Sequence, residues 1–339
     1  MLIAEPGARA VELLERAECL LDERSLDSAW QSFINAESAG ADPDRCGAGR
    51  WQIAMLRGDF ESAWKESDAI RTRAAHPESF WSGEDIDDRR VILRCLHGFG
   101  DAVQMLRYAP QLAARAANVV YEVAPRMLPL VRCFKDVSNA ITWNDVSPEW
   151  DLQIELMELP QLFRTTISEL PLARNYLNLP ESSLQLAADS LGPRRRPRVG
   201  LVWSCGDWNP SRNVPPHEFA GLAALDVEFW NLEPQSSTKD CFGLQMSDAR
   251  PFTDGLLPLA ATIANLDLVI APDTLAAHLA GALGKPAFVM LQYAADWRWM
   301  VERDDSPWYP SLHLFRQPAP GDWLSVIESI KTNLHGLVM

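Results

Sequence analysis

The sequence predicts an α/β protein in which two doubly wound parallel-sheet domains follow an all-α helical domain. Three observations indicate this fold class: a helical period before residue 75, alternating strands and helices from Arg89 onward, and a basic linker at 192–198 between two such alternations. We therefore divide the chain into a helical domain at 1–82 and two sheet domains at 83–192 and 193–339. A ligand cleft is expected at the carboxyl ends of the strands.

Residues 8–74 are expected to form four short helices in two hairpins. Apolar residues recur with a helical period, and breaks fall at Ser25–Leu26, Gly40–Pro43 and Gly58–Asp59. The stretch 42–70 loosely resembles a tetratricopeptide repeat, so we expect a tetratricopeptide-like helical domain. Two hairpins are fewer than the roughly three repeats that a free solenoid needs, so this part should dock on later segments of the chain. A packing role and a peptide-binding role both stay open.

The first sheet domain is expected to begin with an apolar strand at 91–96. A helix over 101–117 should follow, and Pro110 should kink or end it near Ala109. The remaining expected elements are a strand at 118–123, a helix at 125–134 and strands at 140–143 and 151–156.

The second sheet domain repeats the alternation after the linker 192–198. Its arginines are expected to form a solvated hinge, with a ligand patch as the alternative. Gly284 should end one helix in the left-handed conformation. The expected strands are 199–204, 227–232, 268–270 and 286–291, and the expected helices are 216–225, 257–265, 275–283 and 322–334.

Composition excludes some classes of function. The 339 residues carry a net charge of −15, which argues against a nucleic-acid partner because a polyanion requires a basic face. No apolar run reaches the roughly 18 residues that a membrane span needs. The N-terminus turns acidic and amphipathic at once, so we expect no signal peptide. Six scattered cysteines without a C-x-x-C pair favour reduced thiols and a cytoplasmic protein.

A glycine turn, with Gly98 and Gly100, follows the first predicted strand and suggests a nucleotide-binding loop. A dinucleotide site is disfavoured, because Val103 replaces the third glycine of the usual fingerprint and the Asp101 carboxylate would repel phosphates. Glu122, near the end of the second strand, is a weak point in its favour. Asp101 can instead cap the helix. It can also act as a general base, since glycines let a second molecule approach the turn closely.

The segment 268–283 predicts an anion site, because a strand and a loop precede a helix of small residues. The loop ends in Asp273 and Thr274, which are good helix caps, and the amides of Leu275 and Ala276 follow. Together with the helix dipole, these groups are expected to hold a diphosphate. His278 is either a packed core histidine or a ligand contact.

Further polar groups follow other strand ends of the second sheet domain. The loop that begins near Ser204 carries Arg212, which we expect to clamp a phosphate, and Glu233 ends another strand on the same side. No His, Asp or Glu cluster has metal-ligand spacing, so no metal is expected. Trp297 and Trp299 either pack in a core or stack on a ligand.

Four segments resemble a known family: GFGDAVQMLRYAPQLAARAANVVYEV, VGLVWS, DLVIAPDTLAAHLAGALGKP and ADWRWMVERDDSPWYPSLHLFRQPAPGDW. From Arg89 onward the chain resembles bacterial tetratricopeptide-linked glycosyltransferases similar to family 9, the heptosyltransferase-like group. The resemblance implies a GT-B fold with two Rossmann-like domains. It also implies metal-independent, inverting transfer from a nucleotide-diphosphate sugar.

The same resemblance implies roles for individual residues. The aspartate after the glycine turn is the base in that family, which gives Asp101 this role, and the D-T-x-x-x-H segment binds the donor diphosphate. The basic loop residue falls on Arg212, and an acid near the donor ribose or base falls on Glu233. His97 stands where the family commonly has a glutamine. The candidate donor-binding residues are Gly98, Gly100, Ser204, Arg212, Glu233, Asp273, Thr274, Leu275, Ala276 and His278.

The predicted function is therefore a glycosyltransferase that uses a nucleotide sugar as co-substrate and needs no cofactor. The acceptor is expected to be a peptide or protein held partly by the helical domain. One alternative is a non-catalytic, tetratricopeptide-type partner-binding scaffold with a vestigial transferase domain. Another is an epimerase that acts on the nucleotide sugar itself.

Overall fold

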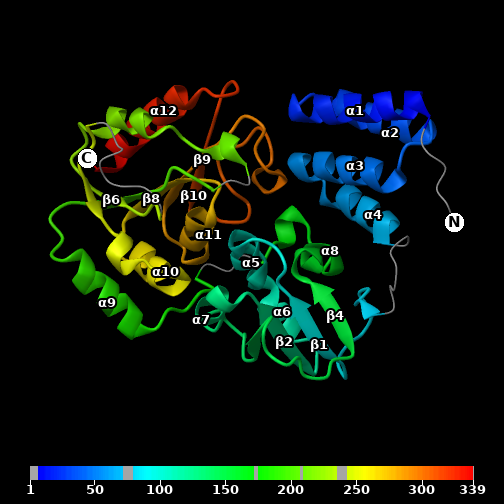
Figure 1. Cartoon of the computed structure of the whole chain (residues 1–339), viewed down its shortest axis with the longest axis horizontal. Helices are drawn as coiled ribbons and strands as arrows, with labels where there is room; N and C mark the ends of the chain where they lie inside the picture. Colours follow the sequence, from blue (N-terminus) through cyan, green and yellow to red (C-terminus); the bar gives the residue numbers. More distant parts are fainter. Residues whose placement is uncertain (1–6, 72–78, 172–174, 207–208, 235–242, 339) are drawn as a thin grey trace. The chain divides into compact units, whose positions relative to one another are not determined.

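The computed structural model describes residues 7–71, 79–171, 175–206, 209–234 and 243–338 (Figure 1). The chain divides into two compact units. The first contains Met1–Gly83, Pro160–Leu170 and Ala294–Arg303, and the second contains Glu84–Leu159, Pro171–Tyr293 and Asp304–Met339. The three-domain division of the sequence stays a prediction.

Four helices begin the first unit: α1 (Ala8–Asp22), α2 (Leu26–Ser38), α3 (Pro43–Arg57) and α4 (Phe60–Arg71). α1 packs on α2 and α3 packs on α4, which confirms the expected helices and the breaks between them. Asp42 begins α3, because its side chain accepts a hydrogen bond from the Asp44 amide at 2.8 Å. Gly58 ends α3 with a left-handed φ of 74°. The likeness to a tetratricopeptide repeat stays a prediction.

Two segments from later in the chain complete the first unit. In Pro160–Leu170, the Thr165 carbonyl accepts a hydrogen bond from the Trp64 indole at 2.8 Å. In Ala294–Arg303, the Trp297 ring lies 5.2 Å from the Trp51 ring, and Trp299 is fully buried. The helices thus dock on later segments as expected. The core-packing interpretation is confirmed for Trp299, whereas Trp297 is partly buried and packs against the helical core.

Gly49 in α3 lets the Phe33 ring lie directly against the helix backbone. A Cβ at position 49 would be 2.2 Å from the ring, whereas a Cβ at Gly47 would meet only the end of the Glu66 side chain, at 3.3 Å, and Ile70 at 3.5 Å. Gly49→Ala should therefore destabilise the protein by about 1–3 kcal/mol through overpacking. Gly47→Ala, the matched control, should be neutral or stabilising because alanine favours the helix by about 1 kcal/mol. Midpoints of urea unfolding, with an unchanged dependence of the unfolding free energy on urea concentration, measure the stability of the two variants. Equal stabilisation by Gly49→Ala and Gly47→Ala would contradict this packing.

The second unit holds two parallel sheets, as the sequence predicts. The first sheet has the strand order β3-β2-β1-β4, with β1 at Arg90–Arg94, β2 at Asn118–Val123, β3 at Ala140–Thr142 and β4 at Leu152–Glu155. The second has the order β10-β9-β8-β5-β6-β7. Its strands are β5 (Arg198–Leu201), β6 (Glu228–Asn231), β7 (Met246–Asp248), β8 (Leu268–Pro272), β9 (Ala287–Leu291) and β10 (Leu312–Arg316).

The helices after residue 98 depart from the prediction in three expected helices, and two further helices, α8 (Leu159–Leu162) and α9 (Glu181–Leu191), were not expected. The expected helix 101–117 is α5 (Phe99–Met105), a 3₁₀ turn and α6 (Ala109–Ala113), because Pro110 starts a new helix. The expected helix 125–134 shortens to a 3₁₀ turn and α7 (Leu128–Val131), and 216–222 is a 3₁₀ helix. The other helices of the second unit are α9, α10 (Leu256–Ala264), α11 (Leu275–Ala282) and α12 (Trp323–Val338). α8 lies at the boundary, with Pro160–Leu162 in the first unit.

Two arginines of the linker form ion pairs with aspartates that lie after the linker in the sequence. Arg194 pairs with Asp267 at 3.0 Å and Arg196 pairs with Asp226 at 3.1 Å, and both arginines are about half exposed. Arg198 departs from the solvated interpretation, because it lies buried in β5. Gly284 has the predicted left-handed φ, at 66°. In the part of the chain that the structure describes, no helix is long and apolar enough to cross a membrane.

Candidate functional site

The loop between β8 and α11 leads to a helix start at which Thr274 and Leu275 are partly buried and Ala276 is buried. Thr274 is the N-cap of α11 in an extended conformation, but its hydroxyl donates to the Pro272 carbonyl at 3.3 Å and does not cap the helix. Among the described residues, no side chain caps this end. The amides of Leu275 and Ala276 therefore begin the helix without a side-chain acceptor, which is the arrangement that a bound anion uses.

Asp273, Arg212 and His278 meet beside this helix start. One Asp273 carboxylate oxygen lies 3.2 Å from an Arg212 guanidinium nitrogen, and the other lies 3.6 Å from His278 Nε2. The same guanidinium also donates to the Asp273 backbone carbonyl at 3.4 Å. Asp273 and His278 are buried, while Arg212 keeps about a fifth of its side chain exposed. The structure thus brings together three residues that the sequence proposed from segments 61 or more positions apart.

Glu233 and Ser204 bind each other at the ends of β6 and β5. The Glu233 carboxylate is buried and accepts hydrogen bonds from the amides of Trp203 and Ser204, at 3.2 and 2.9 Å. It also accepts the Ser204 hydroxyl at 2.7 Å. These bonds hold the loop after β5 in place, because they satisfy its first amides. Contacts of Glu233 and Ser204 with a donor stay predictions.

Asp101 lies at the third residue of α5 and not at its N-cap, because the helix begins at Phe99. Its Oδ2 accepts a hydrogen bond from the amide of the N-cap residue Gly98 at 3.0 Å, so it caps the helix from inside. Asp101 is neither buried nor fully exposed. A carboxylate has roughly four acceptor positions, so this bond is compatible with a second role as a base.

Gly100 brings α5 against α11. A Cβ at Gly100 would lie 2.7 Å from His278 Cδ2, so only glycine permits this approach. The sequence suggested that the glycines admit a second molecule, but at Gly100 the neighbour is a side chain of the same chain. The contact places the helix that carries Asp101 beside α11, whose start is the expected anion site.

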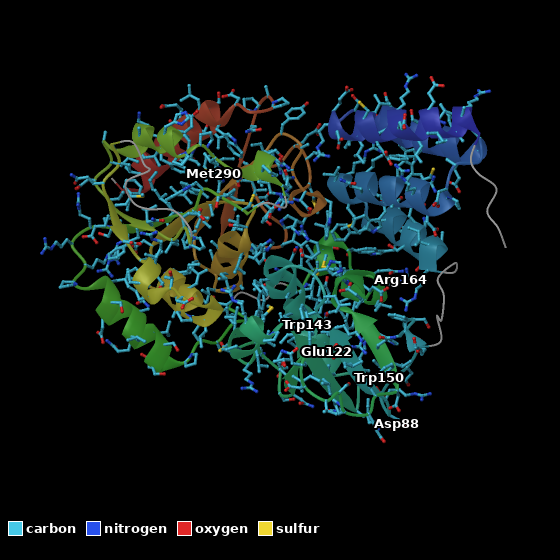
Figure 2. All side chains as sticks on the ribbon, viewed as in Figure 1. Asp88, Glu122, Trp143, Trp150, Arg164 and Met290 are labelled. Atoms are coloured by element: carbon cyan, nitrogen blue, oxygen red, sulfur yellow. The ribbon has the colours of Figure 1, made fainter. Side chains whose placement is uncertain are left out.

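A polar cluster that the sequence did not predict covers the carboxyl end of the first sheet. Arg94 pairs with Glu122 and donates to the Gln153 side chain at 2.9 Å, and its guanidinium lies 5.7 Å from the Trp150 ring centre. Figure 2 labels Glu122 of β2 together with Trp143 and Trp150, which lie between β3 and β4 in the sequence, and Trp143 is 47% exposed. Glu122 is thus engaged by Arg94, which removes the support it lent to a dinucleotide site.

Next to this cluster, His97 Nε2 lies 3.3 Å from a Glu155 carboxylate oxygen. Burial raises the pKa of the Glu155 carboxyl above its usual range, and the nearby His97 opposes that shift. In the described ranges, no group of three or more His, Cys, Asp or Glu side chains could hold a metal ion.

Comparison with known proteins gives one curated relative and a clear fold. No family model matches the sequence. Protein FlbA of Caulobacter vibrioides is 24% identical over 316 residues, which are 81% of this chain and 51% of FlbA. The chain therefore spans about half the length of that relative.

Two solved structures are similar to this chain over nearly their whole length. The family 9 glycosyl transferase of Veillonella parvula has a TM-score of 0.58 at 13% identity, over 75% of this chain and 98% of that protein. The ADP-heptose LPS heptosyltransferase II of E. coli has a TM-score of 0.55 at 13% identity, over 74% and 98% of the two chains. At this identity the likeness establishes the fold alone: the chain has the fold of a family 9 glycosyltransferase.

Proposed function

We propose that this chain is an inverting, metal-independent glycosyltransferase that moves a sugar from a nucleotide-diphosphate sugar to an acceptor hydroxyl or amide. The observation that carries the proposal is the start of α11, where Arg212 and His278 flank amides that no described side chain caps. Helix dipole, guanidinium and imidazole there suit a diphosphate. The shared fold with two glycosyltransferases supports the same ligand class.

The proposed reaction is a single displacement at the anomeric carbon. Asp101 takes the proton from the acceptor while the acceptor atom bonds to that carbon, and the bond from the carbon to the diphosphate oxygen breaks. The nucleoside diphosphate leaves with the bonding electron pair. The α11 amides and Arg212 stabilise the negative charge that grows on it, so no metal ion or other cofactor is needed.

For the acceptor we propose a peptide or protein that the helices α1–α4 help to hold, on the strength of their likeness to a tetratricopeptide hairpin. A cytoplasmic location is also part of the proposal. It is supported by the free thiols among the described residues, which are Cys19, Cys46, Cys95, Cys133 and Cys205.

A melting-temperature screen against ADP-, UDP-, GDP- and dTDP-sugars tests donor binding. At a hundred times its dissociation constant, the right donor should add about 2.7 kcal/mol of stability, which is a shift of several degrees. No shift with any nucleotide would favour a partner-binding scaffold. Sugar interconversion without an acceptor would indicate an epimerase instead.

A further inference from the structure

Arg107 is a buried arginine that joins connecting segments of the two sheets in the second unit. It follows α5, on the connection between β1 and β2, and only 1% of its surface is exposed. Among the described residues it forms no ion pair with a carboxylate. Burying a charge that no acid neutralises costs free energy, so we expect this side chain to do more than fill space.

The partners of the Arg107 guanidinium come from both sides of this contact. Its Nη1 donates to the Trp308 carbonyl at 2.6 Å, and Trp308 lies between β9 and β10 of the second sheet. Its Nε donates to the Gln104 carbonyl in α5 at 2.8 Å. The ring centres of Tyr309, Tyr176 and Trp308 lie 4.6, 5.4 and 5.4 Å from the guanidinium carbon. Charged donors form strong hydrogen bonds and aromatic faces attract a cation, so these contacts tie α5 to the β9–β10 connection.

Close packing holds the other end of α5. A Cβ at Gly100 would lie 2.7 Å from His278 Cδ2, so the start of α5 lies directly against α11. The seven residues of α5 span about 10 Å, with Gly100 near the start and Arg107 beyond the end. A glycine sets how closely two helices approach, but it supplies no directional bond. The orientation of α5 therefore depends on the tie at Arg107.

These two contacts determine where Asp101 lies relative to the proposed diphosphate site. Asp101 is next to Gly100 on α5, and the proposed site is the start of α11 at Leu275. Without the tie at its far end, α5 can pivot about the Gly100 contact, which displaces the Asp101 carboxylate while α11 keeps its own packing. A displacement of about 1 Å at a reacting group can cost about a hundredfold in rate.

We propose that Arg107 is a positioning residue that fixes the separation between Asp101 and the diphosphate site on α11. The proposal rests on the proposed function for the reaction that needs this separation, but the tie exists without a ligand. Removing the tie should lower the rate of sugar transfer and leave the affinity for nucleoside diphosphates unchanged. An arginine that acted as a distant cation would instead raise that affinity, and one that only filled space would change neither quantity.

Three variants grade the loss of the tie. Arg107→Met keeps the length of the side chain but removes its charge and hydrogen bonds, and single-turnover transfer at saturating donor should fall about 30-fold. In Arg107→Lys the rate should fall about tenfold, because an ammonium restores the charge but cannot reach both carbonyls as the planar guanidinium does. Tyr176→Phe keeps the buried cation and removes only the hydrogen bond from the Tyr176 hydroxyl to the Val103 carbonyl, 2.9 Å long in the structure. Its rate should fall about threefold.

Calorimetric titration with ADP, UDP, GDP and dTDP measures the affinity of the same proteins. The affinity for the cognate diphosphate should stay within about twofold of the parent value in all three variants, because the α11 site is intact. Arg90→Gln is the matched control. Arg90 lies on β1 and pairs with Glu149 and Asp151, at 2.8 Å each, with 44% of its side chain exposed. Its loss should change neither the rate nor the affinity.

Hydrogen exchange of the protein without ligand provides the second readout. The amides of α5 should exchange faster in Arg107→Met and Arg107→Lys than in the parent, while those of α11 stay unchanged. In Arg90→Gln both helices should exchange as in the parent. Unchanged exchange of α5 in the Arg107 variants, an unchanged transfer rate, or an affinity that falls as much as the rate would each overturn the proposal. If α5 exchanges faster as expected and none of the four nucleoside diphosphates binds the parent, the tie stands and the proposed function fails.

Discussion

Asp101→Asn is expected to lower sugar transfer by about 10²–10⁴-fold and to leave donor binding unchanged. The amide cannot take a proton from the acceptor, but its oxygen can still accept the Gly98 amide, which lies 3.0 Å from Oδ2 in the structure. The start of α5 and its contact with α11 should therefore survive. Initial rates of product formation and calorimetric titration with the donor measure the two quantities separately.

Asp322→Asn is the matched control for this substitution. Asp322 precedes α12, and its Oδ1 accepts a hydrogen bond from the Ser325 amide at 3.1 Å, so it also stabilises a helix start. Both variants should lose a similar, small amount of stability, but only Asp101→Asn should lose turnover. Full turnover in Asp101→Asn would remove the general base from the mechanism. Loss of donor binding in the same variant would show that Asp101 acts by stabilising the conformation of the α5 start rather than as a base.

The two strand–turn–helix segments of the candidate site could be predicted, because the signals for them are local in the sequence. A β-branched run, two glycines and an acid predict a strand, a turn and a helix start, and β1 and α5 confirm them. The same holds for β8 and α11, whose loop is punctuated by Pro272, Asp273 and Thr274. The predicted helix start at Asp101 was wrong by two residues, because Phe99 and Gly100 gave no reason to begin the helix earlier.

The partners of His278 could not be predicted in this way. Arg107 contacts the Trp308 carbonyl across 201 residues, and His278 contacts Tyr309 across 31. Nothing in the local pattern of a Leu-Arg-Tyr turn indicates a buried guanidinium, because the pattern records only the period of apolar residues. The only local hints were Gly100 and Gly281, two glycines inside helices where alanine would be expected.

Tertiary packing also explains the missed elements. β7 has three residues, with no buried pair to give a strand period, and it joins the sheet only through its pairing with β6. β10 lies in a tryptophan-rich stretch in which aromatic residues masked the alternation of Leu312 and Leu314. The segments Pro160–Leu170 and Ala294–Arg303 join the helical unit although both come after sheet elements in the sequence. The hydrophobic period of a segment does not show which distant part of the chain the segment packs on.

Arg212→Gln is expected to lower kcat by about 10²–10³-fold, the second-largest effect. The guanidinium lies at the start of α11 with its nitrogen 3.2 Å from the buried Asp273 carboxylate, where a leaving diphosphate would gather negative charge. Glutamine can keep a hydrogen bond to Asp273 but supplies no charge. The kcat of Arg212→Lys should lie between those of the parent and of Arg212→Gln. An ammonium keeps the charge but lacks the planar guanidinium that binds a phosphate through two hydrogen bonds. Single-turnover rates at saturating donor measure this loss apart from changes in affinity.

Arg194→Gln controls for the loss of an arginine–aspartate pair as such. Arg194 pairs with Asp267 at 3.0 Å with 58% of its side chain exposed, so the pair should contribute at most about 1 kcal/mol and nothing to turnover. If Arg212→Gln lost only stability and kept its turnover, Arg212 would be the structural partner of Asp273. The α11 amides and His278 would then carry the leaving-group charge between them. The order Arg, Lys, Gln in single-turnover rate, with Arg194→Gln equal to the parent, is the result that assigns Arg212 to the transition state.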